Sequence, residues 1–458
     1  MQFQHHAMGV CLACIILTSS VAFSASIPRN ALPPTTDLDL ITILDNGANN
    51  PMEGNEWLSD IASSIVSNLT GIRTQDESVQ STREKIENLF AYGHLNIPEA
   101  ASMVASSGLV SSEILSFLNG FLNQSLNSIH NENQASSNID IYPLKSEADA
   151  PYSVREDDLR AAIHIPNSFS YGKNGKKPLI LVPGTAIPAG TTYHFNFAKF
   201  GNAVPTADVV WVNIPGSSFS DAQVNAEYVA YAIHYISSIS NANVAMLSWS
   251  QGGLNVQWAL KYWPSTRSVV DDFIAMSPDF HGTIARALVC PLLETVICTP
   301  SIWQQGWDTN FMQTIREDGG DSAYVPTTTI YSTFDEIVQP MIGDNASAII
   351  RDIRGVGVTN NHLQSICPGK PAGGVYTHEG TLYNPLAWAL AIDAFTHDGP
   401  GQPDRVNMEA ACEQFLAPQL ELDDILGTHG LLLVAVAGLL VYMPKTTAEP
   451  KIAAYALD

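Results

Sequence analysis

Basic residues are scarce in this chain. Its 458 residues include only 21 lysines and arginines against 45 aspartates and glutamates, which gives a formal net charge of -24. A protein with this charge balance repels the phosphate backbone of nucleic acids and anionic membrane surfaces. We therefore expect no nucleic-acid partner. Charged residues of both signs make up only 14% of the chain and hydrophobic residues 45%, which indicates a folded protein with a large core.

Metal-binding signatures are also missing. The chain contains no H-E-x-x-H motif, and its one C-x-x-C pair, Cys11 and Cys14, lies inside an apolar leader-like segment. A structural or catalytic zinc site needs three or four ligands at a recognisable spacing. The sequence therefore predicts no metal site and no cofactor.

The first 25 residues have the pattern of a secretory signal peptide. Met8–Val21 is apolar, and Ala22–Ala25 offers the small residues that a signal peptidase cleaves after. Positive charge before the apolar core is absent. Residues 26–52 are polar and contain prolines, which is typical of a linker or a disordered start. We expect a secreted, extracellular protein.

Cysteine is rare, and four cysteines remain outside the leader: Cys290, Cys298, Cys367 and Cys412. An even number in a secreted chain predicts two disulfides. Three pairings are possible, and the most local one joins Cys290 to Cys298 and Cys367 to Cys412. Secretion would also allow glycosylation at the sequons of Asn68, Asn123 and Asn345.

Two regions with different sequence patterns follow the linker. Residues 53–145 carry apolar side chains at helical spacing, for example from Trp57 to Leu69, and we expect a small all-helical region that serves as a propeptide, a lid or a structural cap. Residues 146–458 alternate short apolar runs with helical stretches. That alternation predicts an α/β fold with a mostly parallel sheet and helices on both faces.

One stretch of the second region has the layout of a nucleophile elbow. The apolar run 244–249 ends at Ser250, and Gly252 and Gly253 lead into a helical stretch. In an elbow of this kind, a tight turn between strand and helix exposes the serine hydroxyl above the sheet. The usual G-x-S-x-G pattern has a serine, Ser248, in place of its first glycine. A buried strand that runs into a helix through a serine is the alternative interpretation.

An acid and a histidine follow Ser250 in the order of an α/β-hydrolase triad. Asp335 stands after the apolar run 327–333, where the acid of that chain order belongs. The histidine candidates are His362, His378, His397 and His429. We favour His378, which lies between a glycine-rich loop and a helical stretch, and interpret the other three as surface or packing residues. A solvated loop histidine is the alternative for His378.

These residues suggest a division of roles. A serine hydroxyl needs a base, so His378 would take the proton of Ser250, and Asp335 would orient the imidazole. The oxyanion of the reaction needs hydrogen-bond donors. The backbone N–H of Gln251 and the N–H or hydroxyl of Thr185, at the end of the first strand, are the candidates. An ordinary turn residue is the alternative for Thr185.

Six short motifs in order resemble the family of Candida antarctica lipase B and related secreted fungal lipases. They are Leu181–Thr185, Trp249–Gly253, Ser277–Asp279, Ser301–Gln305, Val325–Thr328 and Asp335–Pro340. The resemblance extends from about residue 150 to about residue 445. It implies an α/β-hydrolase fold, a triad of Ser250, Asp335 and His378, an oxyanion hole at Thr185 and Gln251, and a disulfide between Cys367 and Cys412.

The resemblance also explains Ser248, because the family carries a small hydroxyl residue at that place. It implies that Asp279 and Glu336 are acids close to the triad, with plain structural hydrogen bonding as the alternative. Two family disulfides are missing here. Conversely, Cys290 and Cys298 fall in the segment that matches the family's small lid, and their pairing would stiffen it and alter access to the site.

The apolar run Ile425–Met443 has two interpretations. Its length of about 19 residues could just span a bilayer. It also matches the long hydrophobic helix that walls the active-site entrance in the lipase family. We favour the lipase helix, because His429 and several glycines weaken the membrane-spanning alternative.

The function that these residues predict is the hydrolysis of carboxylic esters of lipids by a secreted serine hydrolase that resembles triacylglycerol lipases. Its partners would be a lipid ester substrate and, transiently, a lipid interface, with no obligate protein partner. Two alternatives remain open. One is a carboxylesterase for small soluble esters, and the other is a catalytically silent binding protein on a hydrolase scaffold.

Overall fold

The computed structural model of the protein describes residues 78–91, 97–111, 113–114, 125–135, 140–284 and 298–457. All of them fall in one compact unit, Pro34–Asp458. The predicted signal peptide, the linker, the helix around Trp57–Leu69, the sequons of Asn68 and Asn123, and Cys290 lie outside the described residues and stay predictions.

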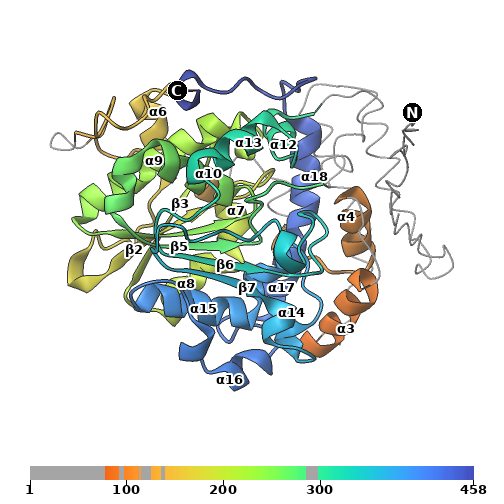
Figure 1. Cartoon of the computed structure of the whole chain (residues 1–458). Helices are drawn as coiled ribbons and strands as arrows, with labels where there is room; N and C mark the ends of the chain where they lie inside the picture. The colour runs from red at the N-terminus through yellow and green to blue at the C-terminus, as the bar shows by residue number, and fades with distance from the viewer. Residues whose placement is uncertain are drawn as a thin grey trace, which may run out of the picture. The chain divides into compact units, whose positions relative to one another are not determined.

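A seven-stranded sheet forms the centre of the described part of the chain (Figure 1), with the strand order β1-β3-β2-β4-β5-β6-β7. Strand β1 is antiparallel to β3, and every other neighbouring pair is parallel. The strands are β1 Ile163–His164, β2 Lys177–Val182, β3 Ala207–Val212, β4 Val244–Trp249, β5 Val270–Met276, β6 Thr327–Tyr331 and β7 Val358–His362. The predicted mostly parallel α/β fold is thus confirmed.

The central strands are apolar at successive positions because both of their faces are covered. Every residue of β4 is buried, as expected for a parallel strand between two helical layers. Side chains of one face, such as Ile180, Val182 and Met246, share a core with the helices α9 and α10.

Helices α9 (Ala222–Ser240) and α10 (Gly252–Tyr262) cover one face of the sheet, and α8 (Phe200–Ala203) and α15 (Pro385–Thr396) cover the other (Figure 1). Their ends follow from local sequence: the Asp221 carboxylate caps α9, and Asn384 caps α15. The further α-helices are α3 Val79–Phe90, α4 Ile97–Ser106, α6 Glu156–Ala161, α7 Ala189–His194, α12 Pro300–Gln304, α13 Asn310–Arg316, α14 Leu363–Ile366, α16 Met408–Cys412, α17 Leu422–His429 and α18 Leu431–Val441.

Helices α3 and α4 fall inside the predicted all-helical region of residues 53–145. Helix α4 packs against α18 (Figure 1). Further along this region, the described residues include the 3₁₀ turn η2 (Ser125–Asn127). The Asn127 side chain there donates to the Thr191 hydroxyl at 2.8 Å, so this end of the region is tied to helix α7.

The C-terminal apolar run consists of the two helices α17 and α18, which meet at Gly430. The stretch Leu422–Leu439 is long and apolar enough to cross a membrane by length and composition, but 78% of it is buried inside the protein. Burial of this extent is typical of a core helix, which favours the predicted lipase helix over a membrane span.

The predicted disulfide between Cys367 and Cys412 is present, with a Cα–Cα distance of 5.4 Å. Cys298 is buried and disulfide-bonded, but Cys290 lies outside the described residues, so the pairing of these two stays a prediction. Asn345 ends the exposed turn η9 (Gly343–Asn345). Its exposure is compatible with the predicted glycosylation.

Candidate active site

Ser250 stands at the turn between β4 and α10, as the elbow pattern predicts. Its φ of 57° lies in the left-handed region, a conformation that non-glycine residues adopt rarely and that is typical of a strained functional turn. Its backbone N–H donates to the carbonyl of Met276 at 3.0 Å, and its carbonyl accepts from Gly253 at 2.8 Å. The turn is therefore pinned on both sides of the serine.

Close packing explains the small residues around Ser250. A Cβ atom on Gly252 would lie 2.5 Å from the carbonyl oxygen of Val182 and 3.2 Å from the Cβ of Ser248. A Cβ atom on Gly184, at the end of β2, would lie 2.7 Å from the Cβ of Ser250 itself. Glycine at both places lets the β2 loop reach the nucleophile, and a small residue at Ser248 keeps the strand and the helix close.

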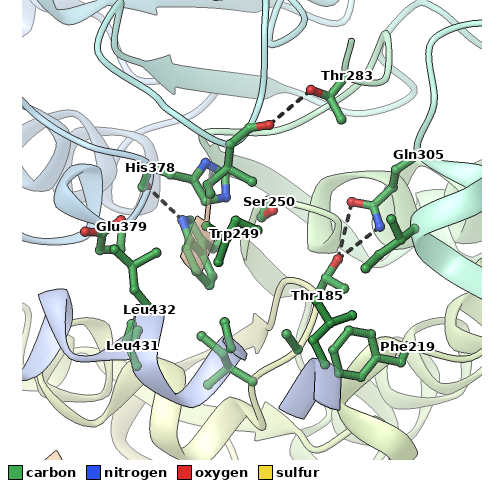
Figure 2. Close-up of a pocket in the computed structure, with 17 residues that line it drawn as sticks. Thr185, Phe219, Trp249, Ser250, Thr283, Gln305, His378, Glu379, Leu431 and Leu432 are labelled. Carbon is green, nitrogen blue, oxygen red and sulfur yellow. Dashed lines mark hydrogen bonds between the residues drawn. The ribbon is translucent and has the colours of Figure 1, made fainter. Parts of the chain in front are cut away.

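The structure brings Asp335 and His378 together in the predicted manner. The Asp335 Oδ2 atom lies 2.7 Å from His378 Nδ1, and both side chains are buried. A carboxylate only accepts hydrogen bonds, so Nδ1 carries the proton and Nε2 is left as an acceptor. That Nε2 atom has no hydrogen-bond partner among the described residues, and His378 lines the same pocket as Ser250 (Figure 2).

The other oxygen of Asp335 is held by the backbone. Oδ1 accepts the N–H groups of Ile337 at 3.0 Å and Val338 at 2.7 Å. These two bonds fix the orientation of the carboxylate, so that Oδ2 points at the imidazole. Asp335 follows β6 in the loop where the strand ends predict it.

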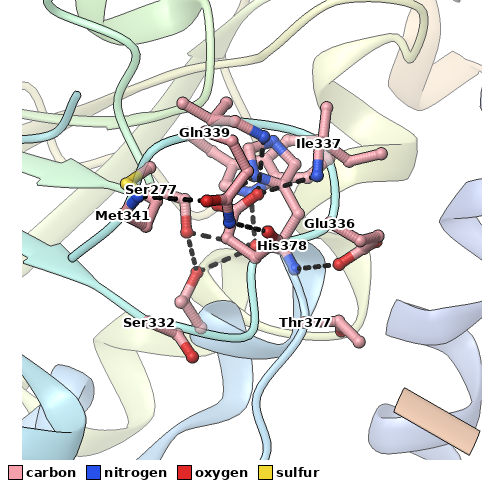
Figure 3. A network of polar contacts seen from close by, with 12 residues as sticks. Ser277, Ser332, Glu336, Ile337, Gln339, Met341, Thr377 and His378 are labelled. Carbon is pink, nitrogen blue, oxygen red and sulfur yellow. Dashed lines mark hydrogen bonds and ion pairs between the residues drawn. The ribbon is translucent and has the colours of Figure 1, made fainter. Parts of the chain in front are cut away.

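The backbone of His378 is anchored just as firmly. Its N–H donates to Glu336 Oε2 at 3.0 Å (Figure 3). Its carbonyl accepts from Trp249 Nε1 at 3.1 Å, and also from the hydroxyl groups of Ser277 at 3.2 Å and Thr381 at 3.1 Å. These four hydrogen bonds all involve the backbone of His378. They hold the residue in place and leave its ring nitrogens to other partners.

The remaining candidate histidines lie elsewhere. His362 ends β7 and contacts the hydroxyl groups of Thr333 and Ser365, and His397 ends α15 beside Asp393. Neither lines the pocket of Ser250. His429 is fully buried in α17, where its Nδ1 atom lies 2.7 Å from Glu379. The sequence predicts only a surface or packing role for His429 and does not indicate this contact with Glu379.

Thr185 and Gln251 stand beside Ser250, and a third residue joins them. The Thr185 hydroxyl donates to the side-chain oxygen of Gln251 at 2.6 Å. The Gln305 amide donates to Thr185 Oγ1 at 3.0 Å (Figure 2). Gln305 ends the motif Ser301–Gln305, but nothing in the sequence alone indicates a role for it. Its amide identifies it as a residue that orients the predicted oxyanion hole.

The pocket above Ser250 has apolar walls. Phe219, Ile302 and Ile337 line one part of it, and α18 contributes a row of aliphatic side chains. Ile97 of α4 also lines the pocket, so this N-terminal helix helps to form the wall. The aliphatic side chains from α18 are Leu431, Leu432, Ala435 and Leu439.

The two predicted acids are buried next to the triad. Neither oxygen of Asp279 has a hydrogen-bond partner among the described residues. Burial, together with the nearby charge of Asp335, raises the pKa of Asp279 to about 7. Burial and the charges of Glu379 and Asp335 also raise the pKa of Glu336 well above its usual value. Glu336 anchors His378 and so has at least the structural role.

Asp279 makes the stability depend on pH. The unfolded chain releases this proton near pH 3.8, whereas the folded protein keeps it to about pH 7. Stability therefore falls as the pH rises through this window, by about 4 kcal/mol at most. We expect Asp279→Asn to raise the melting temperature at pH 8 and to leave it unchanged at pH 4. An equal shift of the melting temperature at both pH values would contradict this origin.

The geometry can be compared with known proteins. Lipase B of Pseudozyma antarctica is 31% identical to this chain over 310 residues, which are 67% of this chain and 85% of that protein. The crystal structure of Aspergillus fumigatus lipase B matches with a TM-score of 0.84 at 63% identity, and the match covers 91% of this chain and 99% of that one. No family model matches the chain.

The extent of these matches shows the family. The first relative is matched over most of its own length, and the second shares the whole fold of the described sheet and helices. The α/β-hydrolase fold and the carboxylic ester hydrolase class predicted from the sequence are thereby confirmed. The chain therefore belongs to the family of lipase B and is an ester-hydrolysing enzyme of the α/β-hydrolase fold.

Proposed function

We propose that the protein is a secreted lipase that cleaves lipid esters with a triad of Ser250, His378 and Asp335. The observation that carries this proposal is the Asp335–His378 hydrogen bond of 2.7 Å, in a histidine that lines the pocket of Ser250 and whose Nε2 atom has no hydrogen-bond partner among the described residues. A base that is oriented by a carboxylate and opens onto a serine at a strained turn is the arrangement of serine hydrolases.

In the reaction that we propose, His378 Nε2 takes the hydroxyl proton as Ser250 Oγ attacks the ester carbonyl. The tetrahedral intermediate collapses when the imidazolium returns the proton to the leaving alcohol, and an acyl-enzyme remains. Water then attacks the acyl group, with His378 again as the base, and releases the carboxylic acid. Asp335 stays ionised and stabilises the imidazolium in both steps.

The oxyanion of each intermediate needs donors that are oriented in advance. We assign the backbone N–H groups at Gln251 and Thr185 to this role, with the Thr185 hydroxyl as a further donor. In the structure this hydroxyl donates to the Gln251 side chain. Rotation of the hydroxyl toward the substrate would replace that acceptor with the oxyanion. The Gln305 amide, which donates to Thr185 Oγ1, supports that exchange.

The walls of the pocket support lipid esters as the substrate class. Aliphatic side chains from α4 and α18 face the site, and burial of an acyl chain against them contributes about 0.8 kcal/mol for each methylene. The disulfide between Cys367 and Cys412 fits an oxidising compartment, which supports secretion together with the leader. The contact of Ile97 with the pocket favours the cap among the roles of the N-terminal helices.

The experiment that tests this function is a series of p-nitrophenyl esters of increasing acyl length. We expect kcat/KM to rise by up to about fourfold per added methylene until the apolar walls are filled, and emulsified long-chain esters to be hydrolysed.

A preference for the shortest soluble esters in this series would instead identify a carboxylesterase. Failure to hydrolyse any member would refute lipid esters as the substrate class of this enzyme. The control is the same series without enzyme, which corrects for the spontaneous hydrolysis of each ester.

A further inference from the structure

A second buried carboxylate–imidazole pair stands directly behind the triad. Glu379 follows His378 in the chain and begins the 3₁₀ helix η11 (Glu379–Tyr383). Its Oε1 atom lies 2.7 Å from His429 Nδ1, and both side chains are essentially inaccessible to solvent. Although burial opposes ionisation, the hydrogen bond and the charge of His429 lower the pKa of Glu379. The carboxylate therefore accepts from an Nδ1–H donor.

The other nitrogen of His429 is satisfied as well. The hydroxyl of Tyr383 lies 2.9 Å from Nε2. Burial raises the pKa of Tyr383 well above its usual value, so the phenol stays neutral and its hydroxyl shares a hydrogen bond with Nε2. The result is a buried chain from Tyr383 through His429 to Glu379. None of these groups is used by the reaction proposed above.

These hydrogen bonds join the loop that carries His378 to the helix that forms the wall of the pocket. His429 is the last residue of α17, and Gly430 leads directly into α18. Leu431 and Leu432, the first residues of α18, line the pocket beside Glu379 and His378 (Figure 2). Glu379 is thus the sequence neighbour of His378, and His429 stands two residues before Leu431, which lines the pocket.

Glu379 also acts on the anchor of His378. After burial, the charge of Glu379 is the largest influence that raises the pKa of Glu336. Glu336 in turn accepts the backbone N–H of His378 through Oε2, so Glu379 lies beside the carboxyl group that anchors the base.

We propose that Glu379 and His429 form a clasp that positions His378 against the pocket wall of α18. Both are positioning residues, because neither touches the reacting atoms. The proposal rests on the proposed function, in which His378 is the base. Misplacement of a catalytic group by about 1 Å costs roughly 10²-fold in rate, so loss of the clasp should lower kcat more than it raises KM.

The test compares two replacements of His429. His429→Leu keeps the bulk and removes the donor, whereas His429→Asn offers a side-chain N–H close to the place of Nδ1–H. We expect the leucine variant to lose about ten- to hundredfold in kcat, and the asparagine variant to stay within a few-fold of the parent. KM should change little in either. The rates are referred to the number of sites that a fluorophosphonate labels at Ser250.

A packing role predicts the opposite order. The ring of Phe90 stacks on the imidazole of His429 at 6.2 Å, so leucine would fit better than asparagine if only packing mattered. A leucine variant at least as active as the asparagine variant therefore overturns the clasp. His397→Leu, at an exposed histidine outside this network, is the matched control and should keep the parent kcat.

Two further results keep the test decisive. If the leucine variant does not fold, Tyr383→Phe removes only the hydroxyl at Nε2, and the clasp predicts a few-fold fall in kcat at constant KM. An unchanged kcat in that variant overturns the clasp. If the fluorophosphonate does not label Ser250 in the parent protein, the proposed function fails instead, whatever the histidine variants show.

Discussion

Replacement of Ser250 by alanine is expected to lower kcat for a p-nitrophenyl ester by about 10⁶-fold. The elbow gives the site one hydroxyl at the end of β4, and the turn that carries it is fixed by hydrogen bonds to Met276 and Gly253. Without that hydroxyl no acyl-enzyme can form. A residual rate above the uncatalysed reaction would come from the oxyanion donors and from binding alone.

The measurement is the steady-state rate at saturating ester, with the melting temperature recorded in parallel to show that the variant is folded. Ser268→Ala is the matched control, because Ser268 is exposed and bonds only to the Ser265 carbonyl among the described residues. Near-parental activity of the Ser250 variant would refute the nucleophile assignment and with it the proposed function.

Replacement of Asp335 by asparagine is expected to lower kcat by about 10⁴-fold. The reason lies in the two oxygens. Because Oδ1 accepts two backbone N–H groups, from Ile337 and Val338, the amide oxygen of an asparagine must take that place. Its NH₂ group then faces His378 Nδ1 and donates to it. The imidazole is forced to carry its proton on Nε2, where it can no longer accept one from Ser250.

This loss should appear in kcat and not in binding. We expect an unchanged KM and an unchanged melting temperature within a few degrees, since the asparagine keeps the size of the side chain. Asp404→Asn, at an exposed position, is the control for the change of charge. A loss below about tenfold would show that the orientation of His378 does not depend on Asp335.

Two residues of the proposed triad could be predicted because they follow strands with a clear sequence pattern. Strand β4 is buried at every position and is mostly apolar, and Ser250 comes directly after it. Strand β6 is also buried throughout, although it contains three threonines, and Asp335 lies in the loop that follows it. His378 is harder to identify from the sequence, because it follows no strand and three other histidines are also candidates. Its identification rests on the chain order and on the resemblance to the lipase family.

The features that were missed lack such a signal. Strand β7 (Val358–His362) lies at the sheet edge, where polar residues such as Asn360 and Asn361 are tolerated, so it has no apolar run. Strand β1 has only two residues. Glu379 and His429 meet across 50 positions of sequence, and nothing in the spacing of two such residues indicates that folding places them in contact.

Part of the apolar surface over Ser250 is built from segments that are far apart in the sequence. Ile97 precedes every strand of the sheet, and the α18 side chains follow all of them. The strands that carry the nucleophile and the acid lie between. Substitutions in these two segments can therefore change the apolar wall without altering the strands that precede the nucleophile and the acid. The architecture is suited to the divergence of substrate range within one reaction.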